Sequence, residues 1–300
     1  MIANPSADAL DHPGRHRLER RKDLTRLTIE TIDDLLDLVL ERKAGSIDLR
    51  NARFVDPYAL LLLDLLMLEL RDRGRRVDLV RPASPVVNRW MGAMGFPSAK
   101  PAGGAEAPST RDPASALQPI ASIDDESHVG RIVDGFEQRL ADRHPLSDDG
   151  RRSLIAIMIE LFQNVPHHSN ADGSVEDPHG IAAMQDYEDS IFLAIADRGI
   201  GLRGSLGLRD GYEGITSSQA LRAILDQGVS RFDDPGRGGE LQRIARIVRS
   251  WDGTFAVRSG DALLYFDDKG ADVYDVPEFP GVQFGLRLPR HIFGIGMLES

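Results

Sequence analysis

In the N-terminal third of the chain, apolar positions change repeatedly from strand-like to helix-like spacing. Two helix starts are marked by a capping side chain followed by proline, Asp56-Pro57 and Ser84-Pro85. The pattern predicts strands at 26–29, 46–49 and 77–80, and helices at 31–43, 56–73 and 84–94. Strands that alternate with helices indicate a small α/β layer structure.

The C-terminal half has a different order, in which helices come first and a hairpin and closing strands follow. Helices are predicted at 129–143, from Ser147 through the apolar positions up to Phe162, at 217–225 and at 241–249. Strands are predicted at 181–184, 190–196, 255–257, 262–266 and 282–288. This order favours an α+β sandwich of two layers, with helices on one face of a mixed sheet.

A stretch poor in apolar residues separates the two regions. It is rich in Pro, Ala, Gly and Ser, and such a segment buries too little apolar surface to offset the entropy of ordering it. The predicted organisation is a flexible leader at 1–22, an N-terminal domain at 23–96, a linker at 97–122, a C-terminal domain at 123–291 and a tail at 292–300.

Composition narrows the classes of protein to consider. The chain has no cysteine, which excludes disulfides, thiolate metal sites and a cysteine nucleophile. Its net charge of −11 argues against a nucleic-acid-binding protein. No apolar run approaches the roughly 18–20 residues of a membrane span, and the polar N-terminus does not read as a secretory signal. We therefore expect a cytoplasmic protein that binds neither membranes nor nucleic acids.

Three polar residues share one face of the predicted helix that follows Ser147. Glu160, Asn164 and His168 recur every fourth residue, so their side chains project in the same direction, next to the apolar stripe. Pro166 indicates that the helix kinks or ends there. For the helix alone, a solvated polar face is the simpler interpretation.

Two glycine motifs follow this helix and favour a ligand site instead. Asp197, Gly199 and Gly201 come directly after an apolar strand, where glycines allow a close approach of the backbone to a ligand. Gly236 and Gly238 precede the helix at 241–249, and free N–H groups at a helix start attract anions such as phosphate.

Taken in order, these motifs resemble those of the GHKL ATPases, the family of gyrase, heat-shock chaperones, histidine kinases and mismatch-repair ATPases. The resemblance covers most of the C-terminal domain and implies the two-layer Bergerat fold with Mg²⁺ and ATP as cofactors. It implies that Asn164 coordinates Mg²⁺, that Glu160 is the general base, and that His168 lies on the phosphate side.

The same resemblance assigns roles to the glycine motifs. Asp197 is expected to accept a hydrogen bond from the adenine amino group, with Gly199 beside the adenine and Gly201 as the hinge of a lid. Gly236 and Gly238 are expected to close on the phosphates. The chain departs from the family pattern at Glu240, where a glycine is common, and at Val282, where a threonine is common.

The N-terminal domain resembles a STAS domain, the fold of anti-sigma-factor antagonists. The resemblance is carried by residues 47–50, 54–60 and 76–80. Antagonists carry a phosphorylated serine two residues after the motif aspartate, and this chain has Tyr58 at that position, where packing is the simpler interpretation.

Together the resemblances imply an ATP-binding regulatory protein similar to the anti-sigma-factor kinases. Its expected partner is a regulatory protein that is STAS-like, sigma-factor-like or of another kind, and formation of a homodimer stays open. The first alternative is an ATP-gated interaction module with little or no catalysis, which the absence of a serine at Tyr58 favours. A degenerate scaffold that binds no nucleotide is a second alternative, motivated by Glu240 and Val282.

Overall fold

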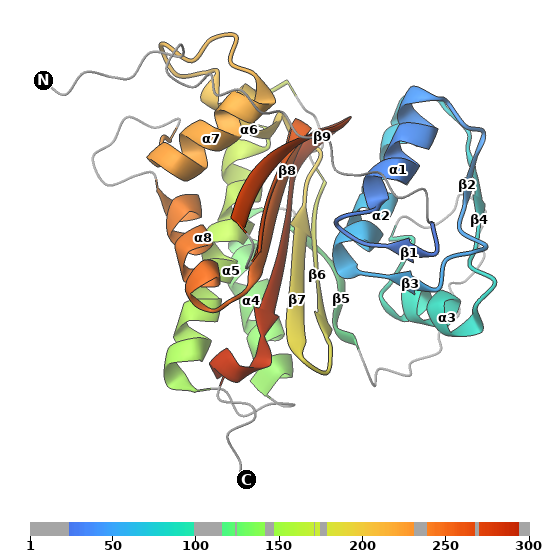
Figure 1. Ribbon diagram of the computed structural model, residues 1–300, viewed down its shortest axis with the longest axis horizontal. Helices are drawn as coiled ribbons and strands as arrows, with labels where there is room; N and C mark the ends of the chain where they lie inside the picture. Colours follow the sequence, from blue (N-terminus) through green and yellow to red (C-terminus); the bar gives the residue numbers. More distant parts are fainter. Residues whose placement is uncertain are drawn as a thin grey trace, which may run out of the picture.

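The computed structural model describes residues 24–98, 116–123, 125–141, 147–170, 172–174, 179–230, 239–267 and 270–293. Two layered structures of helices and strands lie side by side, one built from the described residues before 99 and one from those after 115 (Figure 1). Both halves of the chain therefore combine helices with strands, as the sequence predicts.

The N-terminal domain consists of short parallel strand pairs and helices that pack on them. Its elements are β1 (Arg26–Leu27), α1 (Ile32–Leu36), the π-helical turn η2 (Asp37–Glu41), β2 (Ser46–Asp48), β3 (Phe54–Val55), α2 (Pro57–Asp72), β4 (Asp78–Val80) and α3 (Pro85–Ala93). Strand β1 pairs with β3, and β2 pairs with β4. Asp56 caps α2 by accepting the N–H of Ala59 at 2.7 Å, as its place before Pro57 predicts.

The C-terminal domain is a five-stranded sheet with helices against one face. Its elements are β5 (Ala116–Ile123), α4 (Glu126–Ala141), α5 (Asp148–His168), β6 (Gly180–Asp186), β7 (Ser190–Ala196), α6 (Gly201–Leu206), α7 (Ser217–Gln227), α8 (Glu240–Ser250), β8 (Thr254–Asp267), β9 (Gly270–Pro289) and the 3-10 turn η3 (Arg290–Phe293). The strand order is β5-β6-β7-β9-β8.

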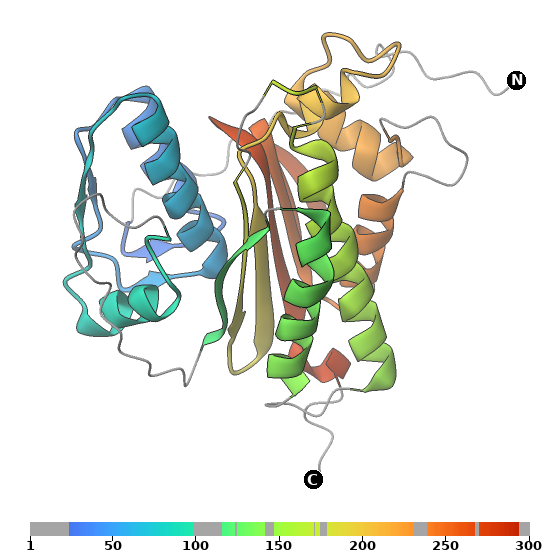
Figure 2. The ribbon, with the colours of Figure 1, turned by 180° about the vertical axis from the view of Figure 1, so that it is seen from behind.

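Both faces of this sheet are buried. Along β7, Ile191, Leu193 and Ile195 pack against the helices of the C-terminal domain, whereas Phe192 and Ala194 pack into the core of the N-terminal domain. Helix α2 lies across β6, β7 and β9 on that second face (Figure 2). The N-terminal domain therefore takes the place of a second helical layer, which explains why β7 is a continuous apolar run and does not alternate.

Three expectations from the sequence are wrong. The sheet is antiparallel throughout its described pairings, not mixed. The strands expected at 255–257 and 262–266 are one strand, β8, with a register shift near Gly260. Residues 116–122, assigned to the linker, belong to edge strand β5, where Pro119 is tolerated because β5 has only one neighbour and its register shifts there.

The expected leader, most of the expected linker and most of the expected tail fall on residues 1–23, 99–115 and 294–300, which lie outside the described part of the chain. The sequence pattern does not predict strand β3, because two residues are too short to show a period. It does not predict helix α6 either, since this helix begins at Gly201 within the glycine motif.

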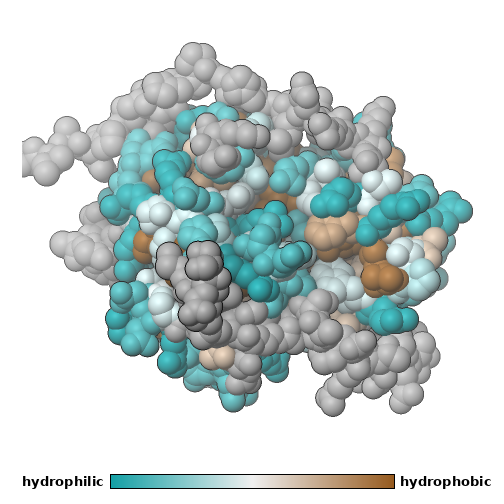
Figure 3. All heavy atoms as spheres, turned by 60° about the horizontal axis from the view of Figure 1, so that its bottom comes forward, coloured by the Kyte–Doolittle hydropathy of each residue, from teal (hydrophilic) through white to brown (hydrophobic). Residues whose placement is uncertain are grey.

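The described surface gives no sign of a large apolar face. Among the coloured residues of Figure 3, hydrophilic ones cover most of the visible face, and hydrophobic ones lie in separate patches. Among the described residues, the large apolar side chains with high exposure are Val86 and Leu208. No helix among them is long and apolar enough to cross a membrane.

Candidate functional site

A pocket opens between the sheet and the helices of the C-terminal domain. Its volume, counting the solvent at its mouth, is about 700 Å³. Its walls come from α5, α6, α7, the start of α8 and strand β9, and its lining residues are Asn164, Ser169, Asp197, Gly201, Leu202, Ser205, Leu206, Ile224, Val229, Ser230, Gly239, Glu240, Leu241, Val282 and Phe284. Three of the residues singled out from the sequence, Asn164, Asp197 and Gly201, thus meet in one cavity.

Helix α5 positions Asn164 at the pocket. Ser147 caps the helix, and its apolar side packs into the core through residues such as Leu161 and Phe162. The Asn164 side-chain Nδ2 donates to the backbone oxygen of Glu160 at 2.8 Å. This bond leaves the amide oxygen Oδ1 as the atom that can serve a ligand. Pro166 does not end the helix, which continues to His168.

Glu160 lies on α5 one turn before Asn164 but is not part of the pocket lining. Its Oε1 pairs with Nη2 of Arg243, on α8, at 2.7 Å. Both side chains are partly exposed, so this ion pair contributes on the order of 1 kcal/mol or less to stability. The pair holds the candidate base in a contact between two helices. The side chain of His168, at the end of α5, lies outside the described part.

Asp197 is the most strongly perturbed group at the pocket. It is buried, and its Oδ1 accepts the N–H of Gly199 at 2.7 Å. The backbone N–H of Asp197 donates to Val282 O at 3.0 Å. Burial raises the pKa of Asp197 to about 7, against the lowering effect of the bonds from Gly199 and Val282. The fold thus keeps a costly carboxyl group beside a cavity.

Three glycines bring the backbone around Asp197 into close contact. A Cβ on Gly199 would lie 2.2 Å from the backbone oxygen of Ser169 at the end of α5. Gly201 has a positive φ of 70° and packs on Ser259, whose hydroxyl accepts the N–H of Leu202 at 2.8 Å. Gly281 has a φ of 82°, and a Cβ there would lie 2.0 Å from Asp197 O. Gly199 therefore packs the loop on α5 and is not itself part of the pocket lining.

The start of α8 forms another part of the pocket wall. Gly239 precedes the helix with a φ of 81°, and Glu240 opens it. Both line the pocket, so a carboxylate lies at this wall. Gly236 and Gly238 fall on residues 231–238, outside the described part.

The segment expected to be a lid is largely helical where it is described. Residues 203–230 contain most of α6 and all of α7, whose Thr216 and Gln219 form a capping box. Leu206, Tyr212 and Leu221 are buried in the core of the C-terminal domain. The helix predicted at 217–225 is present as α7, helix α6 was not predicted, and the role of this segment as a lid stays a prediction.

Several residues of the site were not found from the sequence. Gly281 lies within β9, where the register with β8 shifts, and its only signal is the departure from the family's Gly-Thr pair. Arg243 follows the glycine turn on α8, but nothing in its spacing indicated a partner on α5. Ser205 and Ser230 line the pocket, but no motif in the sequence indicated them.

Among the described residues, no group of three or more His, Asp or Glu side chains converges on a metal-sized space. Comparison of the chain with protein-family models and with curated proteins finds no match. The function of this chain must therefore be argued from the pocket itself.

Proposed function

We propose that the C-terminal domain binds Mg-ATP in this pocket and that the chain is a regulatory protein of the anti-sigma kinase type. The observation that carries the proposal is the meeting of Asn164 and the buried carboxyl group of Asp197 in one pocket. The two residues stand 33 positions apart in the sequence, and motif order alone suggested their meeting.

The Asp197 end of the pocket suits an adenine base. Apolar side chains such as Leu202, Val282 and Phe284 offer flat packing surface. Oδ2 of Asp197 is an acceptor suited to the exocyclic amino group of adenine, which guanine lacks at that position. A buried carboxylate gains more from this donor than an exposed one, because water competes less for it.

The Asn164 end suits the hydrated metal of a nucleotide. A carboxamide oxygen is a ligand that Mg²⁺ accepts, and this cation keeps most of its other positions for water and phosphate. The Nδ2 bond to Glu160 O fits that role, because it uses the amide donor and leaves Oδ1 as the atom that can bind a metal. When bound, Mg²⁺ would neutralise charge on the phosphates. Gly239 brings backbone without a side chain to the same region.

Glu160 is the candidate base, and its contact with Arg243 limits what it can do. A general base must lie within hydrogen-bond reach of the proton that it accepts. With Oε1 held at 2.7 Å by Arg243, Glu160 is outside the pocket lining. Phosphoryl transfer or hydrolysis through Glu160 therefore requires that this ion pair opens or that α8 moves with the nucleotide.

The second candidate function is an ATP-gated interaction module with little catalysis. Two observations favour it: the paired state of Glu160 and the placement of Tyr58. Tyr58 is 2% exposed and packs on the sheet at Gly285, on the face away from the pocket. Tyr58 therefore acts as a packing residue and is not accessible as a phosphorylation substrate in the folded chain.

Calorimetric titration with Mg-ATP, paired with measurement of phosphate release, tests the proposal. Asn164→Ala should abolish or strongly weaken binding, because it removes the metal's protein oxygen. Glu160→Gln should bind as well as the wild type and lose about 100-fold or more in turnover. Gln163→Ala, a partly buried neighbour that does not line the pocket, is the control. Equal binding by Asn164→Ala and Gln163→Ala would contradict the metal assignment. Wild-type binding without turnover would leave the gating module.

A further inference from the structure

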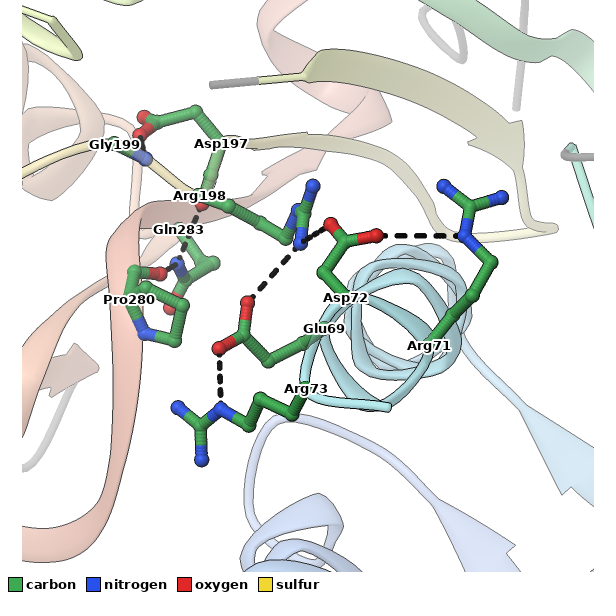
Figure 4. A network of polar contacts seen from close by, with 9 residues as sticks. All are labelled: Glu69, Arg71, Asp72, Arg73, Asp197, Arg198, Gly199, Pro280 and Gln283. Atoms are coloured by element: carbon green, nitrogen blue, oxygen red, sulfur yellow. Dashed lines mark hydrogen bonds and ion pairs between the residues drawn. The ribbon is translucent and has the colours of Figure 1, made fainter. Parts of the chain in front are cut away.

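Arg198, the residue between Asp197 and Gly199, connects the pocket loop to the N-terminal domain. Its side chain is 8% exposed, and its Nη1 pairs with Glu69 at 3.0 Å and with Asp72 at 2.8 Å. Both acidic residues lie in the last turn of α2 (Figure 4). One buried cation of the C-terminal domain thus bridges two carboxylates of the N-terminal domain.

The two carboxylates divide their oxygens between Arg198 and arginines at the end of their own helix. Glu69 gives Oε1 to Arg73 at 2.7 Å and Oε2 to Arg198. Asp72 gives Oδ1 to Arg71 at 3.4 Å and Oδ2 to Arg198. Arg71 and Arg73 are more than half exposed, whereas Arg198 is buried, so the bonds to Arg198 are the better shielded from solvent.

The bridge reaches a loop whose geometry depends on short local contacts. Next to Arg198, the Gly199 N–H donates to Asp197 Oδ1, and Ile200 N–H donates to Ser169 O at 2.8 Å. On the other side, Gln283 Nε2 donates to Asp197 O at 3.0 Å and to Pro280 O at 2.8 Å. A shift of Arg198 would therefore displace the Asp197 carboxyl group relative to the pocket.

We propose that Arg198 is a positioning residue through which docking of α2 on the sheet sets the affinity of the pocket for Mg-ATP. The proposal rests on the proposed function for the identity of the ligand. By linkage, nucleotide binding strengthens the docking of the N-terminal domain by the same factor. The N-terminal domain then regulates the pocket from the opposite face of the sheet, without touching the nucleotide.

A purely structural role for the bridge makes a different prediction. A buried cation left without its partners destabilises the whole fold. Loss of stability alone lowers the population of folded protein but leaves the Kd of the folded molecules unchanged. The Kd for Mg-ATP, measured on protein that is fully folded by circular dichroism, separates the two roles.

Two ways of breaking the bridge and their combination form the test. Arg198→Met removes the cation and leaves each carboxylate its neighbouring arginine, so it is the gentler change. Glu69→Gln with Asp72→Asn removes the carboxylates from the other side. The control is Arg71→Gln with Arg73→Gln, which disturbs the same carboxylates and leaves Arg198 in place.

We expect Arg198→Met and the Glu69/Asp72 pair each to weaken Mg-ATP binding about tenfold, within the roughly 5- to 150-fold range of common couplings. The variant that combines Arg198→Met with the Glu69/Asp72 pair should bind Mg-ATP as well as the weaker-binding of the two separate variants. The effects should not add, because all three variants break the same bridge. Hydrogen exchange at Gly199, Ile200 and Leu202, measured without nucleotide, should accelerate in these variants and not in the Arg71/Arg73 control.

The outcomes are distinct. A wild type that binds Mg-ATP, with Arg198→Met binding equally well, overturns the inference alone. The inference is also overturned if the Arg71/Arg73 control weakens Mg-ATP binding as much as Arg198→Met, because loss of positive charge then explains the effect. A wild type that does not bind Mg-ATP overturns the proposed function, and with it the claim that Arg198 sets the affinity for this ligand.

Discussion

Replacing Asp197 with asparagine should make the protein more stable and unable to bind ATP. Asparagine is nearly the same size, and its amide oxygen can accept the Gly199 N–H that Asp197 accepts at 2.7 Å. The variant therefore removes one charge from a buried position without opening a cavity. Gain of stability with loss of binding is the signature of a group kept for its ligand.

The size of the stability change follows from the pKa of Asp197. Burial raises it to about 7 in the folded protein. Against about 3.9 for an unperturbed aspartate, the difference of about three units corresponds to about 4 kcal/mol at about 1.36 kcal/mol per unit. The folded state holds the proton more tightly, so stability is greatest at low pH and falls as pH rises from about 4 to about 7. At about pH 8 the variant should exceed the wild type by up to about 4 kcal/mol.

Urea unfolding followed by circular dichroism measures this difference. The gap between variant and wild type should be small near about pH 4 and should widen up to about pH 7. Burial also raises the pKa of Asp56 to about 7. Asp56 is present in both proteins, so its pH-dependent contribution to stability cancels in the difference. A gap that does not change with pH would refute the argument that burial of the charge is the cause.

Affinity for nucleotide should fall in the Asp197→Asn variant, whereas its stability rises. The amide of the Asp197→Asn variant would present its NH₂ group to the adenine amino group, so that two donors face each other. In the wild type, affinity for Mg-ATP should rise as pH increases through about 7, by about tenfold between about pH 6 and about pH 8, as the carboxylate fraction grows. An Asp197→Asn variant that binds Mg-ATP like the wild type would refute the adenine contact.

Three further predictions concern single contacts of the structure. Gly281→Ala should weaken Mg-ATP binding at least tenfold by calorimetry, an effect on the order of 1.4 kcal/mol or more, because its Cβ would meet Asp197 O at 2.0 Å. Gly214→Ala, with a similar φ of 75° and open space around it, is the matched control, and equal effects of both variants would contradict this reasoning. Arg243→Ala should accelerate phosphate release if Glu160 is the base, and the acceleration should vanish when Glu160→Gln is combined with it. Tyr58→Phe should leave any phosphoprotein signal from labelled ATP unchanged and alter stability by less than about 1 kcal/mol, since the Tyr58 hydroxyl is buried without a partner in the described structure.

The sequence predicted the elements with long periodic patterns and three of the residues that line the pocket, Asn164, Asp197 and Gly201. Helix α5 was readable because its apolar stripe and its polar face are both regular. The Asp197 motif was readable because glycines follow an apolar strand. Asn164 and Asp197 were identified from their residue types and their order in the chain, which can be read without knowledge of the packing.

Other features depended on contacts that no local pattern carries. The continuous apolar run of β7 is equally compatible with a core strand covered by helices or with a strand covered by another domain, and only the docked α2 decides between them. The pairing of Arg198 with Glu69 joins residues 129 positions apart. Strand β5 was not predicted because Pro119 usually indicates a loop in a sequence, whereas an edge strand tolerates proline.

The central claim is that one pocket holds Asn164 and Asp197 against opposite ends of Mg-ATP. Equilibrium titration of the wild type with ATP in the presence and absence of Mg²⁺, and with Mg-GTP, tests it most directly. We predict saturable binding of Mg-ATP at a single site, weaker binding without the metal, and little binding of Mg-GTP, whose base carries a carbonyl oxygen where adenine carries its amino group. Equal affinity for Mg-ATP and Mg-GTP, or no binding of either, would contradict the account.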